Sequence, residues 1–307
     1  MAEESVAEES VAGAGVASAA IASPARIERI DPATPIDNSA PVDTNTLADH
    51  STSTDHSARI DKSTSSETTN KIAIIIDDLG YSLQQGMIAA RFPAALTLSI
   101  LPHSPNGVAL AELGHQHGKE IMLHAPMSNI QQLPLDPGGL TDDMRRDSFT
   151  DTLSDGLDSI PHIVGVNNHM GSYLTQLEKP MQWLMAELAR DQLYFIDSRT
   201  SPDSIAHQVA LQHEVASRKR DIFLDNVRSE AAIEQQFQKL LQLARQRGNA
   251  IAIGHPYPET LAFLNRAVPA LASEGIELIF VSELLQEFPA RPLPASVVRA
   301  STEPELP

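Results

Sequence analysis

Eight short apolar runs recur along the middle of the chain, and longer amphipathic or polar stretches separate them. The runs are three to five residues long, are apolar almost throughout, and are rich in Ile and Val. Continuous apolarity, as opposed to alternation, is typical of strands that are buried on both faces, as in a parallel sheet. The runs are Ile72–Ile76, Thr97–Leu101, Ile121–Leu123, Ile163–Val166, Leu193–Ile196, Ile222–Leu224, Ala250–Ile253 and Leu278–Val281.

The stretches between the runs have the pattern of helices, and the clearest is Ser229–Arg247. Ser229 can cap the first turn, and Glu230 lies where the helix dipole favours a negative charge. Gly248 follows the last turn, where a glycine commonly ends a helix. A second helix is expected to begin at Thr141. Strand and helix alternate seven or eight times, which indicates a (β/α) barrel or a doubly wound sheet.

The two ends of the chain depart from this pattern. Residues 1–70 contain the string AEESV twice in succession and almost no large apolar side chains, and residues 289–307 contain five prolines. Segments of this kind bury too little apolar surface to offset the entropy lost on ordering. We predict a disordered acidic tail at residues 1–70, a barrel domain at residues 71–288, and a disordered Pro-rich tail at residues 289–307.

The composition argues against several classes of function. The net charge of the 307 residues is −18, whereas nucleic-acid and anionic-membrane partners require a basic surface. The absence of cysteine excludes disulfides, thiolate nucleophiles and thiolate metal sites. No segment is apolar for long enough to predict a membrane span. Acidic residues stand near the N-terminus where a signal peptide would carry basic ones, so the sequence predicts no signal peptide.

Carboxylates and imidazoles follow five of the runs, at the point where each strand is expected to end. In chain order these positions hold Asp77 and Asp78, then His124, then Asn167, Asn168 and His169, then Asp197 and Ser198, and last His255 after Gly254. The C-terminal ends of the strands in a (β/α) barrel meet on one face, where active sites are built. Three His and three Asp on one face predict a mixed nitrogen and oxygen site for zinc or a similar divalent ion.

These residues also have structural interpretations. A lone His after a strand is commonly a hydrogen-bonded residue, and Asp77 with Asp78 can cap a helix that begins near Ser82. We interpret Asp225 and Asn226, after the sixth run, as such a turn. Paired carboxylates such as Asp77 and Asp197 also allow glycoside hydrolysis. The set of histidines favours the metal site over this third interpretation.

Five motifs at these positions resemble those of a known family. They are Asp77–Gly80 (DDLG), Leu123–Met127 (LHAPM), Gly165–Ser172 (GVNNHMGS), Phe195–Ser198 (FIDS) and Ile253–Pro256 (IGHP). The set is similar to the divergent polysaccharide deacetylases, often called YibQ-like, within the NodB-like polysaccharide deacetylase superfamily. The likeness covers about residues 71–285. NNHMGS and the order of the motifs are specific, whereas DDLG alone is a weak signal.

The resemblance implies a distorted (β/α) barrel of about seven strands with a divalent metal ion, expected to be zinc. Asp78 and His124 match metal ligands of the superfamily. The second metal histidine normally follows the first by four residues, but this chain has Ser128 there. His169 is the expected substitute, because its strand should neighbour the strand before His124.

The resemblance also implies the reaction. Asp77 would be the general base, His255 would protonate the leaving group, and Asp197 would orient His255. The implied function is metal-dependent removal of acetyl groups from a polysaccharide or envelope glycan, in a periplasmic or extracytoplasmic location. The alternative is a catalytically impaired protein of the cell envelope that binds metal or glycan.

Overall fold

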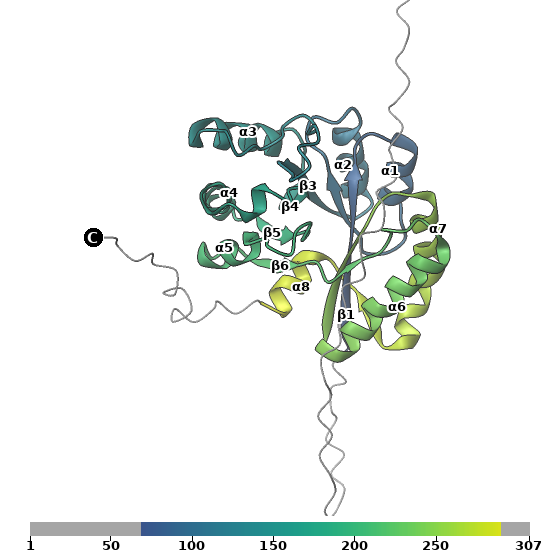
Figure 1. The fold of residues 1–307 in the computed structure, drawn as a ribbon. Helices are drawn as coiled ribbons and strands as arrows, with labels where there is room; N and C mark the ends of the chain where they lie inside the picture. Colours follow the sequence, from purple (N-terminus) through teal and green to yellow (C-terminus); the bar gives the residue numbers. More distant parts are fainter. Residues whose placement is uncertain (1–68, 290–307) are drawn as a thin grey trace, which may run out of the picture. The chain divides into compact units, whose positions relative to one another are not determined.

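The structure of the protein is a computed structural model that describes residues 69–289 (Figure 1). The strands are β1 Asn70–Leu79, β2 Thr97–Ile100, β3 Glu120–Met127, β4 Ile163–Met170, β5 Tyr194–Asp197, β6 Ser217–Lys219, β7 Ile222–Phe223, β8 Asn249–Gly254 and β9 Ile276–Leu278. The helices are α1 Leu83–Ala90, α2 Gly107–Gln116, α3 Arg146–Asp158, α4 Glu178–Arg190, α5 Ala206–Gln212, α6 Glu230–Arg247, α7 Pro258–Ala267 and α8 Val281–Glu287, with short 3-10 helices η1 Leu174–Gln176 and η2 Val268–Glu274. Apart from residues 69, 70 and 289, the two predicted tails lie outside the described residues and stay predictions.

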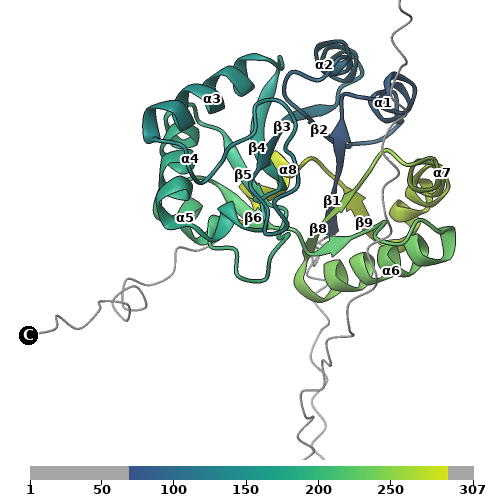
Figure 2. The same ribbon diagram turned by 45° about the horizontal axis from the view of Figure 1, so that its top comes forward.

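The strands form one parallel sheet that curls into a half-closed barrel. Their order is β6-β5-β4-β3-β2-β1-β8-β7, and β9 pairs with β1. Helices α1 to α7 lie around the outside of the sheet, and α8 lies on the inside (Figure 2). This arrangement confirms the (β/α) barrel over the doubly wound sheet. It also brings β8, late in the chain, beside β1.

Alternate side chains along β1 enter two separate cores. Ile72, Ile74 and Ile76 pack against the outer helices, whereas Ala73 and Ile75 face the inside of the barrel, and all five are fully buried. Successive residues of a strand point to opposite faces. Burial on both faces is therefore the reason that the apolar runs are continuous. Helix α8 contributes to the inner core, near the N-terminal ends of the strands.

Helix α6 has the predicted ends, and α3 does not begin where expected. The Ser229 hydroxyl accepts a hydrogen bond from the Ala232 amide, and Gly248 ends α6 with a left-handed φ of 82°. By contrast, α3 begins at Arg146. Thr141 lies in the preceding loop, where its hydroxyl donates to Asp143. The β3–α3 loop is consequently longer than the sequence suggested, and it reaches the functional face.

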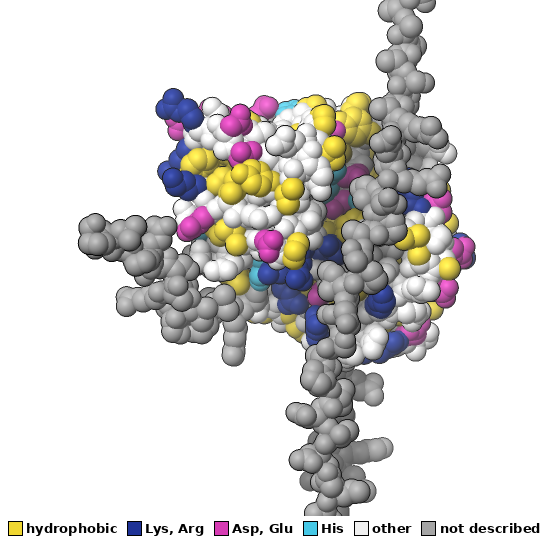
Figure 3. Space-filling view, in the orientation of Figure 1, with side chains coloured by type: hydrophobic (Ala, Val, Ile, Leu, Met, Phe, Trp, Pro, Cys, Tyr) yellow, Lys and Arg dark blue, Asp and Glu magenta, His cyan; other side chains and the backbone are white. Residues whose placement is uncertain are grey.

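The surface of the described domain carries mixed charges. On the face drawn in Figure 3, acidic and basic side chains are scattered among uncharged ones. Within residues 69–289, no helix has the length and hydropathy needed to span a bilayer.

Candidate metal centre

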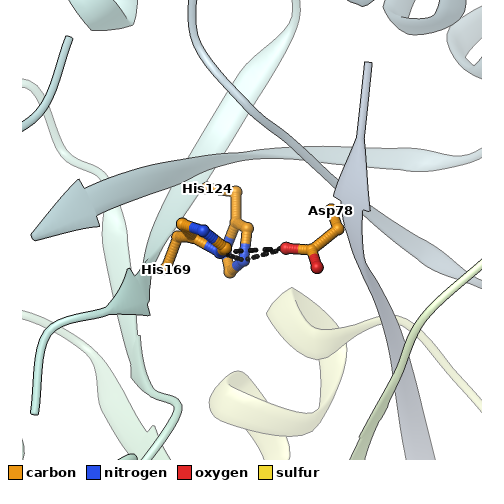
Figure 4. Close-up of side chains that lie close together, drawn as sticks. All are labelled: Asp78, His124 and His169. Atoms are coloured by element: carbon orange, nitrogen blue, oxygen red, sulfur yellow. Dashed lines mark hydrogen bonds and ion pairs between the residues drawn. The ribbon is translucent and has the colours of Figure 1, made fainter. Parts of the chain in front are cut away.

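Asp78, His124 and His169 come from three different strand ends and point toward one another (Figure 4). His124 lies on β3 and His169 on β4, which is the neighbour of β3 in the sheet. The adjacency expected from the sequence is therefore present, and it places the imidazole of His169 beside that of His124.

A bulge near the end of β1 turns Asp78 into this site. Ile76 pairs with Leu98 and Leu79 pairs with Ile100, so three steps along β1 match two steps along β2. Asp78 is the residue with left-handed backbone, at φ 56°. An extra residue in a strand disrupts the alternation of side chains. Consecutive carboxylates, Asp77 and Asp78, consequently both face the functional end of the barrel.

The three ligand atoms form a compact triangle. Asp78 Oδ1 lies 2.9 Å from His169 Nδ1 and 3.1 Å from His124 Nε2, and the two nitrogens are 3.1 Å apart. Ligand atoms bound to a tetrahedral zinc ion lie about 3.3 Å from one another. Asp78 Oδ1 is also buried without a hydrogen-bond partner among the described residues. A buried carboxylate oxygen that faces two imidazole nitrogens fits a divalent cation, so the three residues suit the ion that the sequence predicts.

The electrostatics of the triangle favour a positive charge at this point. Burial alone would raise the pKa of Asp78, but the imidazoles of His124 and His169 lower this pKa far below its usual range. Burial likewise lowers the pKa of His124, but Asp77 and Asp78 outweigh it and raise this pKa to about 9. The carboxylates therefore stabilise a cation, whether a proton or a metal ion.

His255 lies beside the triangle without joining it. Its Nε2 is 3.6 Å from Asp78 Oδ2, while its Nδ1 and its backbone N–H both contact the Asp225 carboxylate, at 2.9 and 2.7 Å. The Thr260 hydroxyl also donates to Asp225, at 2.7 Å. Burial lowers the pKa of His255, but Asp225 and Asp78 raise it above the ordinary value overall. The imidazole thus has a fixed orientation, with Nε2 on the side of the candidate ion.

The predicted partner of His255 was wrong. Asp197 belongs to β5, in which Ile196 faces the inner core and Phe195 faces the helices. Asp197 is one residue beyond Ile196, so its side chain falls on the helix side. There it accepts hydrogen bonds from the Arg199 amide, at 2.8 Å, and from the Ser204 hydroxyl, at 2.9 Å.

Asp225 holds His255 in the place of Asp197. The sequence interpretation of Asp225 as a simple turn residue was also wrong. Asp225 lies two residues beyond the end of β7. Its buried carboxylate there contacts both His255 and Thr260 of α7.

Asp77 is buried beneath the triangle. Its Oδ2 lies 3.6 Å from His124 Nε2, and its Oδ1 accepts a hydrogen bond of 2.8 Å from Asn167 Nδ2. Burial lowers the pKa of the nearby Arg220, and the negative charges of Asp77 and Asp197 partly oppose this effect. Arg220 is held by the carbonyl oxygens of Ser198 and Arg199, at 2.7 and 3.1 Å. Arg220 could not be identified from the sequence, because this residue follows β6, a strand of three residues that contains no apolar run.

A second carboxylate that the sequence reasoning missed lies on the outer side of His169. Asp136, in the β3–α3 loop, places Oδ2 3.4 Å from His169 Nε2. The Tyr81 hydroxyl donates to Asp136 Oδ1 at 2.6 Å. Burial and then Asp136 raise the pKa of Tyr81 to about 12, so this hydroxyl remains a donor. Loops after β1 and β3 are thereby joined at the edge of the candidate site.

The family model for divergent polysaccharide deacetylases matches residues 74–285. The chain belongs to this family. As a member of this family, it has the (β/α) barrel that its motifs implied. It is 37% identical over 224 residues to the uncharacterized protein YibQ of Escherichia coli K12, over 73% of this chain and 70% of YibQ. It is 34% identical over 215 residues to an uncharacterized protein of Haemophilus influenzae Rd, over 70% of this chain and 76% of that protein.

One solved structure has a similar fold. The crystal structure of the uncharacterized protein ATU2773 from Agrobacterium tumefaciens C58 superposes with a TM-score of 0.68, at 24% identity. The match covers 70% of this chain and 89% of the solved chain.

Proposed function

We propose that the protein is a metal-dependent hydrolase that removes acetyl groups from a polysaccharide or envelope glycan in an extracytoplasmic compartment. The carrying observation is that His255, fixed by Asp225, lies next to the triangle of Asp78, His124 and His169. The membership of the family supports the substrate class and the location.

The proposed roles follow from the chemistry of each group. When bound by the triangle, a divalent ion lowers the pKa of water toward ~7 and polarises an acyl carbonyl. Asp77 accepts the proton that the attacking water loses. His255 gives a proton from Nε2 to the sugar nitrogen or oxygen as the bond between it and the acyl carbon breaks. The products are acetate and a free amine or hydroxyl group.

The pKa of His255 supports its role as the acid. Asp225, which does not belong to the triangle, opposes the effect of burial and raises this pKa, so it favours the protonated imidazole. Asp225 contacts Nδ1, which leaves the proton on Nε2 facing the site. An acid for a departing amine requires this protonation and this orientation.

A hollow walled mainly by the β3–α3 loop, next to Asp136, offers room for a sugar chain. Its volume is about 860 Å³, within the usual range for ligand sites. Asp136, which contacts His169, forms part of its wall. Leu133 and Tyr173 also line it, and their exposed fractions are 52% and 40%. Apolar faces next to hydroxyl and carboxylate groups suit a sugar ring, which has both kinds of surface. A larger hollow of about 1230 Å³ lies at the opposite ends of β3, β4 and β5, away from the triangle.

The alternative function is metal or glycan binding without turnover. The position of Asp77 favours this alternative. Asp77 is 3% exposed and accepts a hydrogen bond from the Asn167 amide. A water molecule can therefore reach this carboxylate only through the site itself. Glycoside hydrolysis by Asp77 with Asp197 is not supported, because Asp197 is bonded within its own turn.

The test combines metal analysis with an activity panel. Purified protein loaded with zinc, cobalt or manganese would be incubated with chito-oligosaccharides and with O-acetylated glycans, and acetate release would be measured. Release of acetate that stops with a chelator supports the proposal. Stoichiometric metal without acetate release from any substrate would instead favour the binding protein.

A further inference from the structure

One buried amide joins the candidate metal ligand His124 to Asp77. Asn167 lies on β4 with its side chain inside the barrel, and the residue is 0% exposed. Its Oδ1 lies 2.7 Å from His124 Nδ1 and accepts a hydrogen bond of 2.7 Å from the Ser99 hydroxyl. Its Nδ2 donates to Asp77 Oδ1 at 2.8 Å. Each of the three contacts has the length of a good hydrogen bond.

These contacts fix which way the amide points. An ionised carboxylate can only accept hydrogen bonds, so the side of Asn167 that faces Asp77 must be the NH₂ group. The carbonyl oxygen then faces His124 and Ser99, and this oxygen can only accept. His124 must therefore carry a proton on Nδ1, because an unprotonated Nδ1 would meet Asn167 Oδ1 lone pair to lone pair at 2.7 Å.

The proton on Nδ1 determines what His124 can do with its other nitrogen. His124 has one other ring nitrogen, so Nε2 is the atom that can exchange its proton for a metal ion. Nε2 faces Asp78 Oδ1 and His169 Nδ1, each 3.1 Å away. His124 is thus oriented with Nε2 toward the point where a cation would bind.

We propose that Asn167 is the positioning residue of this centre, which fixes His124 as a metal ligand through Nε2 and holds the Asp77 carboxylate in the same network. The inference deepens the proposed function and rests on it for the identity of the metal ligands. An Asn is suited to this position because it offers one acceptor and one donor on a short, stiff side chain. An Asp would oppose Asp77 with a second carboxylate, and a Ser would be too short to reach both partners.

The next residue of the strand is a matched control. Asn168 is also buried, but it lies on the opposite face of β4. There its Nδ2 donates to the Met170 carbonyl at 2.8 Å, and its Oδ1 accepts the Ser198 amide at 2.9 Å. Among the described residues, Asn168 makes no hydrogen bond to His124 or Asp77. Substitution of either Asn removes a buried amide, but only one substitution touches the network.

The first experiment uses the wild-type protein. Nitrogen-15 labelled histidine would be observed by NMR in the metal-free protein and after loading with cadmium-113. His124 should show a slowly exchanging proton on Nδ1 in both states, and in the loaded state its Nε2 should couple to cadmium. His169 should couple through Nδ1. A His124 that lacks the Nδ1 proton, or that binds cadmium through Nδ1, would overturn the proposal.

The second experiment compares Asn167→Leu with Asn168→Leu, because Leu has a similar shape without hydrogen bonds. Zinc affinity would be measured by competition with a chromophoric chelator. Loss of a group that orients a metal ligand commonly weakens binding by about 10–100-fold, and we expect this for Asn167→Leu together with loss of the Nδ1 proton signal. Asn168→Leu should retain both. An equal loss in the two variants would overturn the positioning role, and the wild-type spectrum decides if Asn167→Leu does not fold. Neither readout depends on turnover, so a failure here is distinguishable from an inactive enzyme.

Discussion

The imidazole of His255 and the carboxylate of Asp225 form a hydrogen bond of 2.9 Å between the ends of β8 and β7. These two strands are neighbours at one edge of the sheet. The carboxylate also accepts the backbone N–H of His255, so both the ring and its strand end are tied to β7. The acid proposed for the reaction is therefore carried by a different part of the sheet from His124 and His169.

We predict that Asp225→Asn lowers kcat by about 10–100-fold. A general acid contributes about 10²–10⁴-fold to the rate, and correct orientation of the acid accounts for part of this contribution. Zinc content should stay at the wild-type level. Asp197→Asn is the control, because Asp197 is buried on the helix side of β5 and should change kcat by less than about threefold. Steady-state kinetics on the best substrate of the panel measures both. A larger loss in the Asp197 variant would restore the prediction made from the sequence.

His169→Ala should remove stoichiometric zinc, because it takes away one of three ligands. His117→Ala, at an exposed position, should keep it. Metal content after dialysis against a low concentration of zinc is the measurement. Full occupancy in the His169 variant would show that the ion, if present, is held elsewhere.

Asp77→Asn and His255→Ala should each lower activity by about 10²–10⁴-fold while zinc content and melting temperature change little. The Asn amide oxygen can still accept from Asn167, but it cannot take up a proton from water. Acetate release and metal content would be measured on the same preparations. Activity within tenfold of wild type in Asp77→Asn would remove the role of base from this residue.

His207 gives a prediction for stability against pH that does not involve the metal. Burial, followed by the charge of Lys219, lowers the pKa of His207 to about 4, whereas an unfolded His has a pKa of about 6.5. The unfolded chain therefore binds more protons between these values, so stability is complete above pH 6.5 and decreases as pH falls toward 4.

His207→Asn should reduce this pH dependence. The Asn side chain can still bond to the Ser217 hydroxyl, which now contacts His207 Nδ1 at 2.9 Å. Between pH 7 and pH 4.5 the metal-free wild type should lose about 2–4 °C more in Tm than the variant, or about 1 kcal/mol after allowance for solvent screening. Equal losses in Tm would contradict the assignment.

The apolar runs located most of the strands, and the polar residues that follow them lie near the C-terminal ends of those strands. The ends themselves differ from the prediction, because β1, β3 and β4 continue to Leu79, Met127 and Met170. The last predicted run, Leu278–Val281, overlaps β9 only at Leu278, and α8 begins at Val281.

Asp78, His124 and His169 could be assembled from their positions after the runs and from the barrel. The orientation of side chains could not be predicted in the same way. A run that is apolar on both faces does not reveal which residues face the inside, so Asp197 and Asp225 could not be told apart.

Two further residues, Asp136 and Arg220, could not be predicted from the pattern of apolar runs for a different reason. Asp136 approaches His169 from a long loop, and the path of a loop depends on tertiary contacts such as the hydrogen bond from Tyr81. Arg220 follows a strand too short to show periodicity. Asn167 lies two positions before His169 on the same strand, so the sequence alone indicates that both side chains face the same side. Its partners Asp77 on β1 and Ser99 on β2 could not be predicted from the sequence.

The bulge in β1 also limits how the length of this strand can vary. In a regular strand the two carboxylates would point to opposite faces, and one of them would meet the outer helices. Removal of one residue between Ile76 and Leu79 would restore even pairing with β2. A shorter β1 would then make a more regular sheet and hold one carboxylate fewer at its end, so regular pairing and a pair of adjacent carboxylates are incompatible in this strand.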